Sequence, residues 1–465
     1  MREHELQPAA VIDGYRLEEK LHQGSMAALW RVTRDGATMP MVMKIPLLRG
    51  DDDPAALVGF EVEQMILPAL TGPHVPRFIA AGDFPAQPYI VMECIAGESL
   101  RPRLEQAPLP AGEIAAIGAR VAAALHDIHS QHVVHLDLKP SNVMFRASGE
   151  AVLIDFGLSH HDRLPDLLAE QFHLPMGTAP YMSPEQVRHV RNDPRSDLFA
   201  LGVVLYHLAT GERPYGNPSS VAGLRRRLYR DPVPPIALNP QLPPWLQETI
   251  LRCLEVDPRR RFETAAQLAF ELQHPDQIAL TARAERRSTD GTLDVAKRWL
   301  RSLAAEPPAQ ESCTDRLASA PIVMVAIDLS AGADELAEAL RSTVSRILQA
   351  DRGARLACIT VLKTSRIAID ATEDAEGRSL RVKRLAELKH WARPLNLDGT
   401  AVTCHVLEEP DVAAAIVEFA RSNRADQIVI GARASSVLRR YLGSVSSQVV
   451  AEAPCTVTVV RRAAG

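Results

Sequence analysis

Strand-like and helical patterns are distributed unevenly along this chain of 465 residues, and that distribution constrains the fold more than any other feature. Residues 15–46 alternate between apolar and polar side chains and contain turn residues, which predicts three antiparallel strands. A helical stretch and two short strands follow before residue 96, and helical patterns then dominate from Pro110 to about Gln273. We therefore expect an α+β fold with a small β-rich lobe and a large helical lobe.

A different rhythm begins at Pro321, where strand-like and helical segments alternate to the end of the chain. The predicted strands are 322–328, 354–362, 400–407, 426–432 and 455–460, and the predicted helices are 334–350, 376–392, 410–423 and 443–453. Regular alternation of this kind is typical of a doubly wound, mostly parallel α/β sheet of the Rossmann-like type.

Between these regions the sequence is polar and rich in Pro, Ala and Ser, which is the composition of a linker. We expect a first domain over 12–273, a linker over 274–318 and a second domain over 319–463. Within the linker, "TLDVAKRWLRSLA" at 292–304 predicts one amphipathic helix. Packing against a neighbouring domain explains such a helix better than a membrane anchor does.

Composition and charge exclude several classes of protein. The net charge of −5 gives no electrostatic signature of a nucleic-acid-binding protein. The six cysteines are dispersed without a CxxC pair, which argues against a disulfide scaffold or a zinc site. The first twenty residues are too charged for a signal peptide, and the longest apolar stretch, Leu198 to Ala209, is too short to span a membrane. We expect a cytoplasmic protein.

The segment "HLDLKPSN" places an acid, a base and an amide within six positions. Transfer of a phosphoryl group needs an acceptor for the hydroxyl proton, positive charge near the phosphate, and oxygen ligands for a metal ion. Asp137 suits the first role, Lys139 the second and Asn142 the third.

Three residues elsewhere in the chain complete this set. Lys44 lies in the predicted strand "MVMK", where its ammonium could reach phosphate oxygens. Glu63 follows nineteen residues later in a predicted helix and could hold Lys44 by an ion pair. Asp155, in "IDFG", offers a second metal-binding oxygen.

In this order, the segments resemble the eukaryotic-type serine/threonine protein kinases, including those of bacteria. Further segments that carry the resemblance are "YIVMECIAGESL", "GTAPYMSPEQ", "DLFALG" opened by Asp197, and "DPRRRF". The resemblance implies a two-lobed protein kinase fold that transfers the ATP γ-phosphoryl group to serine or threonine of protein substrates and of the kinase itself, with Mg²⁺ or Mn²⁺. "GTAPYMSPEQ" favours protein substrates over small molecules.

The resemblance also implies roles for individual residues. Catalysis would involve Asp137, Lys139, Lys44 and Glu63, and the metal ligands would be Asn142 and Asp155. ATP contacts would come from Leu21, Gly24, Leu29, Lys44, the gatekeeper Met92, Glu93 and Cys94. Thr178 would contact Asp137 and Lys139 in the activation segment, and Glu185 would pair with Arg261.

Two departures from the family pattern bear on activity. The phosphate loop "HQGSMA" carries His22 and Ala27 at the first and third glycine positions, which predicts weaker or slower use of ATP. Leu136 replaces the arginine that binds a phosphate on the activation segment in most regulated members, so activity should not depend on such an ion pair. The alternative interpretation is a catalytically weak pseudokinase that acts as an adenine-nucleotide sensor or scaffold.

The second domain resembles the universal stress protein family over about 320–463. The resemblance is carried by "VAIDLS" and by the segment from "IGARASS" to "LGSVSSQVV". It implies a nucleotide site formed by Asp328, Val361, Gly431, Gly443, Ser444, Val445 and Ser446. One glycine of the family's loop is Ala434, and the loop is one residue short, so an empty regulatory or dimerisation module stays equally open. A homodimer through "CTVTVV" is expected in either case.

Overall fold

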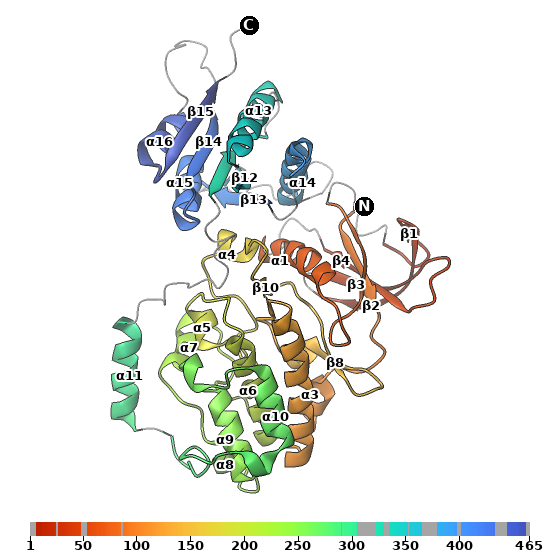
Figure 1. Ribbon diagram of the computed structural model, residues 1–465, viewed down its shortest axis with the longest axis vertical. Coiled ribbons are helices and arrows are strands. Elements are labelled where there is room, and N and C mark those ends of the chain that lie inside the picture. Colours follow the sequence, from red (N-terminus) through yellow and green to blue (C-terminus); the bar gives the residue numbers. More distant parts are fainter. Residues whose placement is uncertain are drawn as a thin grey trace.

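The computed structural model describes residues 6–24, 27–47, 54–84, 87–289, 291–304, 321–329, 334–351, 353–364, 379–397, 401–432 and 444–461. The chain forms a small β-rich lobe, a large helical lobe and a C-terminal α/β domain, which Figure 1 shows stacked along the long axis. The expected lobes and the expected α/β domain are all present.

The small lobe is built on a six-stranded antiparallel sheet and one long helix. In spatial order the strands are β1 (Val11–Ile12), β2 (Tyr15–Gln23), β3 (Ala27–Thr33), β4 (Met41–Pro46), β6 (Tyr89–Glu93) and β5 (Phe78–Gly82), and the helix is α1 (Pro54–Ile66). Alternating side chains divide the sheet into two apolar faces. Trp30 and Met43 are buried on one face, whereas Val42 and Met92 pack with α1 on the other. The sheet therefore fixes the position and orientation of α1 in the small lobe.

The large lobe is mainly helical, with short paired strands at its upper surface. Its helices are α2 (Arg101–Glu105), α3 (Ala111–Ser130), α4 (Leu167–Gln171), α5 (Pro184–Val187), α6 (Arg195–Thr210), α7 (Val221–Arg225), α8 (Pro235–Leu238), α9 (Pro244–Cys253) and α10 (Ala265–Gln273). Its strands are β7 (Val133–Val134), β8 (Val143–Phe145), β9 (Ala151–Leu153) and β10 (His160–His161).

Helix α6 forms the centre of the large lobe and contains the longest apolar stretch of the sequence. It is buried almost throughout, as predicted for a core helix. It approaches α9 so closely at Gly202 that an added Cβ would lie 2.5 Å from the Cβ of Cys253. Below the active-site region, Arg261 Nη2 lies 2.8 Å from Glu185 Oε1, and both side chains are buried. This pair joins α5 to the segment that leads into α10.

The C-terminal domain contains a five-stranded parallel sheet with helices on both faces. In spatial order the strands are β13 (Val402–Glu409), β12 (Arg355–Lys363), β11 (Ile322–Ala326), β14 (Gln427–Ala432) and β15 (Thr456–Arg461). Helices α13 (Asp334–Ala350) and α14 (Leu380–Ala392) cover one face, and α15 (Val412–Ser422) and α16 (Ser444–Glu452) cover the other. The predicted strand–helix order is confirmed, although α14 begins at Leu380 instead of 376.

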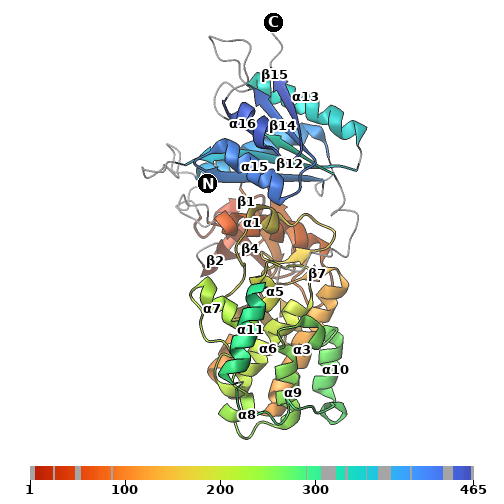
Figure 2. The same ribbon diagram turned by 90° about the vertical axis from the view of Figure 1, so that its left-hand side faces the viewer.

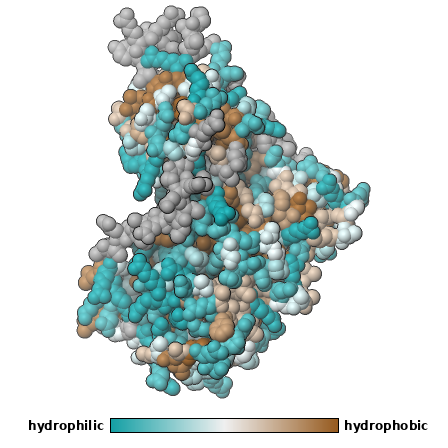
Figure 3. All heavy atoms as spheres, viewed as in Figure 1, coloured by the Kyte–Doolittle hydropathy of each residue, from teal (hydrophilic) through white to brown (hydrophobic). Residues whose placement is uncertain are grey.

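The linker helix predicted at 292–304 is present as α11 (Thr292–Ala304). It does not pack through its apolar side chains as expected, because Leu293, Trp299 and Leu300 are 77%, 45% and 60% exposed. Figure 3 shows apolar atoms at the lower left edge of the molecule, where Figure 1 places this helix. An ion pair of 2.9 Å from Arg298 Nη1 to Asp231 Oδ1 holds it beside the large lobe instead.

Two further expectations concern the chemistry of the whole chain. The five cysteines in the described ranges are free thiols. The sixth, Cys313, lies outside these ranges. No helix in the part of the chain that the structure describes is long and apolar enough to cross a membrane.

The C-terminal domain rests on the kinase-like lobes at α1 and α4. Figure 1 shows α15 above α4 and α14 above α1. Gln171 Nε2 of α4 donates to the Val406 carbonyl of β13 at 3.0 Å, and Asn423 Nδ2 at the end of α15 donates to the Glu170 carbonyl of α4 at 3.0 Å. The domain therefore contacts one helix of each lobe, α1 of the small lobe and α4 of the large lobe.

Candidate active site

The cleft between the lobes contains an ion cluster formed by Lys44, Glu63 and Asp155. Lys44 Nζ lies 2.5 Å from Glu63 Oε2 and 2.9 Å from Asp155 Oδ1. Burial on its own would lower the pKa of Lys44, but the two carboxylates outweigh it and raise that pKa well above its ordinary value. Burial raises the pKa of Glu63, and Lys44 opposes this shift. The lysine thus stays protonated and ties β4, α1 and the segment after β9 together.

Helix α1 is pressed directly against the segment that follows β9. A Cβ added to Gly59 would lie 3.0 Å from the carbonyl oxygen of Gly157, so only glycine permits this approach without a shift of the backbone. Glu63 Oε1 also accepts a long hydrogen bond of 3.4 Å from the backbone N–H of Phe156. The position of Glu63 therefore depends on how closely α1 docks.

The catalytic-loop residues converge on one hydroxyl group. Asp137 Oδ1 accepts hydrogen bonds from the Thr178 hydroxyl at 2.7 Å and from the Thr178 N–H at 2.9 Å. Lys139 Nζ donates to Asp137 Oδ2 at 2.6 Å and to Thr178 Oγ1 at 3.1 Å. Asn142 Nδ2 donates to the Asp137 backbone carbonyl at 3.0 Å and to its carboxylate at 3.2 Å. A carboxylate beside an alcohol and a lysine is the arrangement that proton transfer from a hydroxyl group requires.

The loop that carries Asp137 is held in a strained conformation. Leu136 has a φ of 61°, which is unusual for a bulky residue. Its N–H donates to Asp197 Oδ1 at 2.8 Å, and its carbonyl accepts a bond of 2.7 Å from Gln186 Nε2. Asp197 is fully buried and also accepts bonds from His135 N and His129 Nε2, which outweigh its burial and lower its pKa. A permanent buried carboxylate thus fixes the geometry of the loop.

The residues predicted to bind a metal ion have compatible chemistry. Asn142 directly precedes β8, and its carbonyl accepts a bond of 3.0 Å from Ile154 N, so it lies beside Asp155 across the β8–β9 ladder. Asp155 has a φ of 67°, and Lys44 lowers its pKa to about 2 despite burial. An ionised carboxylate and an amide oxygen suit a hard cation such as Mg²⁺. The described residues contain no group of three His, Cys, Asp or Glu that could hold a metal ion.

Three of the residues predicted to contact ATP share one face of the small-lobe sheet. Leu29 pairs with Lys44 in the β3–β4 register, and Met92 of β6 lies two residues from the partner of Lys44. Leu21, in contrast, is 37% exposed on β2, and Gly24 follows at the end of that strand.

In the phosphate loop, His22 lies close to the one glycine that remains, Gly24. The imidazole Nε2 of His22 would lie 3.6 Å from a Cβ at Gly24, so this side chain stands over the glycine that remains. Gly24 N donates to the Ala27 carbonyl at 3.0 Å.

The backbone N–H of Cys94, in the predicted hinge, is already engaged. Its N–H donates to the Pro40 carbonyl at 2.9 Å, so a contact of Cys94 with adenine would have to use the carbonyl. The Glu93 side chain is also engaged, because its two oxygens pair with the guanidinium of Arg146. Sequence reasoning missed Arg146, since its partner lies 53 positions away and no motif marks it.

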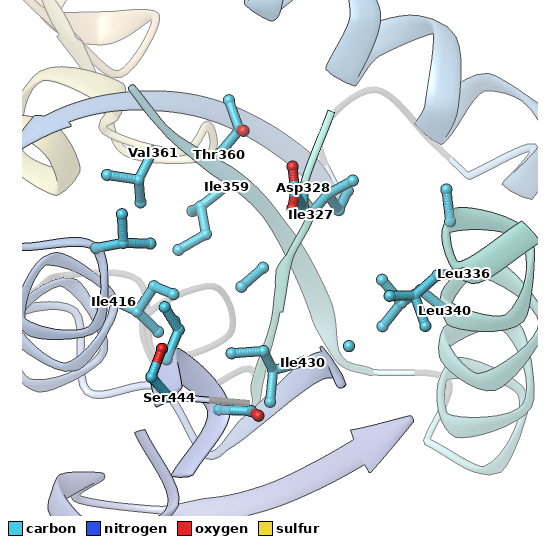
Figure 4. A pocket seen from close by; sticks show the side chains of 16 residues that line it. Ile327, Asp328, Leu336, Leu340, Ile359, Thr360, Val361, Ile416, Ile430 and Ser444 are labelled. Carbon is cyan, nitrogen blue, oxygen red and sulfur yellow. The ribbon is translucent and has the colours of Figure 1, made fainter. Parts of the chain in front are cut away.

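The C-terminal domain contains a second candidate site, a cavity of about 380 Å³ at the carboxyl ends of its strands. Six of the seven predicted nucleotide-site residues line it, namely Asp328, Val361, Gly431, Ser444, Val445 and Ser446. Gly443 lies outside the described residues. Figure 4 shows Asp328 and Ser444 on different sides of the cavity, with Ile359, Ile416 and Ile430 between them. A largely apolar cavity with a few polar groups at its margins is typical of a small-molecule site.

Comparison with known proteins agrees with this geometry. A family model described as "Protein kinase domain" matches residues 15–274, and one described as "Universal stress protein family" matches residues 321–461. The serine/threonine-protein kinase PknB of Mycolicibacterium smegmatis is 32% identical over 294 residues, and that of Mycobacterium tuberculosis is 31% identical over 294 residues. Each alignment covers 60% of this chain and 47% of the relative, so the chain spans less than half the length of these curated proteins.

Among solved structures, the PknI kinase domain of Mycobacterium tuberculosis aligns over 58% of this chain and 99% of its own length, at 24% identity. The TM-score is 0.46, which is too low to add to the argument.

The activation segment is anchored near its start by a second polar cluster that sequence reasoning did not identify. His160 Nδ1 lies 3.1 Å from Asp166 Oδ2, and its Nε2 lies 3.4 Å from Asp162 Oδ1. Arg191 Nε donates to Asp166 Oδ2 at 2.8 Å. Burial on its own would lower the pKa of His160, but its hydrogen bonds to Asp162 and Asp166 raise that pKa to about 9.

This shift predicts a pH-dependent stability. Because the folded pKa of His160 lies above its ordinary value, the stabilisation is complete below about pH 6.5 and is lost as the pH rises through about 9, with a total of up to about 3 kcal/mol. In urea unfolding, the stability lost by the native chain between pH 6.5 and pH 9.5 should be smaller in His160→Gln. His126→Gln, an exposed histidine on α3, should keep the native dependence. Identical pH profiles for all three proteins would contradict the assignment.

Proposed function

Because the chain belongs to the protein kinase domain family, we propose that it transfers the γ-phosphoryl group of ATP to serine or threonine residues of proteins, including its own. The observation that carries the proposal is the convergence of Asp137, Lys139 and Thr178 in one cleft with the Lys44–Glu63–Asp155 cluster. The match to kinases that are named as serine/threonine-specific supports the choice of acceptor.

Each residue of the cleft has a chemical task in this proposal. Asp137 accepts the proton of the attacking hydroxyl group, and in the structure it already holds an alcohol at 2.7 Å. Lys139 places positive charge beside the same oxygen, where negative charge develops on the transferring group. Lys44, held by Glu63, orients the phosphates of ATP, and Asn142 and Asp155 would hold Mg²⁺ or Mn²⁺, which neutralises phosphate charge when bound.

Position 136 is leucine instead of arginine. This fits a kinase that does not require a phosphate on its activation segment. Ser159 is 2% exposed, and its hydroxyl donates to the His135 carbonyl at 3.1 Å. A phosphate could not be placed there without opening this packing. The buried Asp166–Arg191 pair holds the same segment by other means.

Incorporation of radiolabel from γ-labelled ATP tests the transfer directly. Asp137→Asn should reduce the rate about 10²- to 10⁴-fold, because the amide cannot accept the proton, and Asp155→Asn should also abolish incorporation. Asp35→Asn, the same change at an exposed turn, serves as the control and should keep the native rate. Absence of incorporation in the native chain with either Mg²⁺ or Mn²⁺, or native rates in both cleft variants, would refute the proposal.

For the C-terminal domain, we propose that the cavity binds an adenine nucleotide. Its volume, its apolar walls and the start of α16 at Ser444 support this, since the N–H groups at a helix start favour phosphate.

We also propose that the domain pairs with a second copy through β15, which is an edge strand with partly exposed Val457 and Val459. Figure 3 shows apolar atoms gathered near the top of the molecule, in the region of α16 and β15 in Figure 1. We propose that the first domain spans residues 12–273 and the second spans residues 319–463.

Equilibrium dialysis of the full chain with ADP tests the second site. We expect two nucleotides per native chain and one in Asp328→Ala, because the loss of this carboxylate removes a polar contact at the margin of the cavity. Asp351→Ala, an exposed acid at the end of α13, should still bind two. One nucleotide per native chain, or two in Asp328→Ala, would overturn the assignment.

A further inference from the structure

The contact between the C-terminal domain and the rest of the chain is made largely by buried ionic and polar groups. We refer to it as the docking contact, and it comprises Glu61 of α1, Glu170 and Gln171 of α4, and Arg355, Lys389, His405, Val406 and Asn423 of the C-terminal domain. Figures 1 and 2 show α1 and α4 side by side below this domain.

Glu170 is the centre of the docking contact. Its Oε1 accepts a bond of 2.9 Å from Arg355 Nη2, and its Oε2 lies 3.0 Å from His405 Nε2. The Glu170 and Arg355 side chains are each 12% exposed, and that of His405 is 1% exposed. Although burial opposes it, the pairing with His405 and Arg355 lowers the pKa of Glu170. Loss of one partner from a pair this deeply buried leaves a charge uncompensated, which is costly.

Backbone groups of both parts are satisfied across the same contact. The Glu170 carbonyl accepts a bond of 3.0 Å from Asn423 Nδ2, and Gln171 Nε2 donates at 3.0 Å to the carbonyl of Val406. Val406 belongs to β13, one of the two edge strands of the C-terminal sheet. Helix α4 therefore covers an edge that would otherwise expose unpaired backbone groups.

A second point of contact acts on α1. Lys389 Nζ pairs with Glu61 Oε1 and lies 4.4 Å from the centre of the Phe84 ring. Glu61 is 5% exposed and stands two positions before Glu63, which holds Lys44. A change at Glu61 would therefore act on α1, the helix that also carries Glu63.

The docking contact reaches both elements that control the geometry of the cleft. Helix α4 lies between Asp155 and Thr178 in the activation segment, and no arginine at position 136 is present to bind a phosphate there. We infer that the C-terminal domain is a built-in positioning element, which holds α1 and α4 through Lys389 and Arg355 and so maintains the transfer-competent cleft. This inference rests on the proposed kinase function and specifies how the cleft is regulated.

Charge reversal tests this inference in the full chain. Arg355→Glu places a carboxylate against Glu170, and Lys389→Glu places one against Glu61. Each should reduce the maximal rate of radiolabel transfer about tenfold with a smaller effect on the KM for ATP, because positioning and not nucleotide binding is impaired. Lys363→Glu, exposed on the same strand as Arg355, and Lys383→Glu, exposed on the same helix as Lys389, should remain within about twofold of the native rate.

Swapped pairs separate a specific contact from general damage. Glu61→Lys combined with Lys389→Glu, and Glu170→Arg combined with Arg355→Glu, should recover most of the lost rate. Native rates in both single variants, or no recovery in either swap, would overturn the inference.

Amide hydrogen exchange measured without ATP distinguishes failure of the docking inference from failure of the kinase proposal. Exchange in α1 and α4 should rise in Arg355→Glu and Lys389→Glu and stay native in the two controls, whether or not the chain transfers phosphate. If exchange rises in this pattern but the native chain transfers none, the docking contact stands and the kinase proposal fails. Unchanged exchange in both single variants would show that the C-terminal domain does not hold these helices.

Discussion

The Lys44–Glu63 pair is the interaction on which the rest of the cleft depends. Its two residues come from β4 and α1, and Asp155 joins them from the segment after β9. The buried Glu63 carboxylate would be costly without a partner, and Glu63 and Asp155 together keep the lysine charged. In the structure, the pair forms with α1 lying close to Gly157. Sheet, helix and activation segment are therefore set by one ionic cluster.

Strained and buried groups elsewhere support the same geometry. Leu136 and Asp155 both adopt positive φ angles, and each is held by polar partners that other elements supply. Asp197 fixes the loop from below, while Asp166 and Glu170 attach α4 at its two ends, one to the large lobe and one to the C-terminal domain. Carboxylates of the protein itself thus hold the catalytic loop and α4 in place.

Much of this architecture follows from local sequence patterns. The alternation along β2 to β4, the buried α6 and the strand–helix order of the C-terminal domain are all visible in hydrophobic periodicity. The motifs that contain Lys44, Glu63, Asp137, Asn142 and Asp155 predicted one common site through their resemblance to a known family, because that resemblance assigns each residue a place in the fold.

Contacts between distant segments could not be predicted in this way. Gln171 and Val406 are 235 positions apart, and no periodicity links them. Arg146 and Glu93 meet because the residue after β8 lies beside the last residue of β6, and the Cys94 N–H is occupied by the Pro40 carbonyl. The exposed apolar face of α11 was also missed, because an amphipathic pattern states which side is apolar and not whether anything covers it.

The central claim is that Glu63 acts by positioning Lys44 through its charge. The most direct test is the single-turnover transfer rate of Glu63→Gln, an isosteric change that leaves Asp155 and Lys44 in place, measured beside its affinity for ATP. We expect the single-turnover rate to fall about a hundredfold while the protein stays folded and still binds ATP. A native rate in this variant would contradict it.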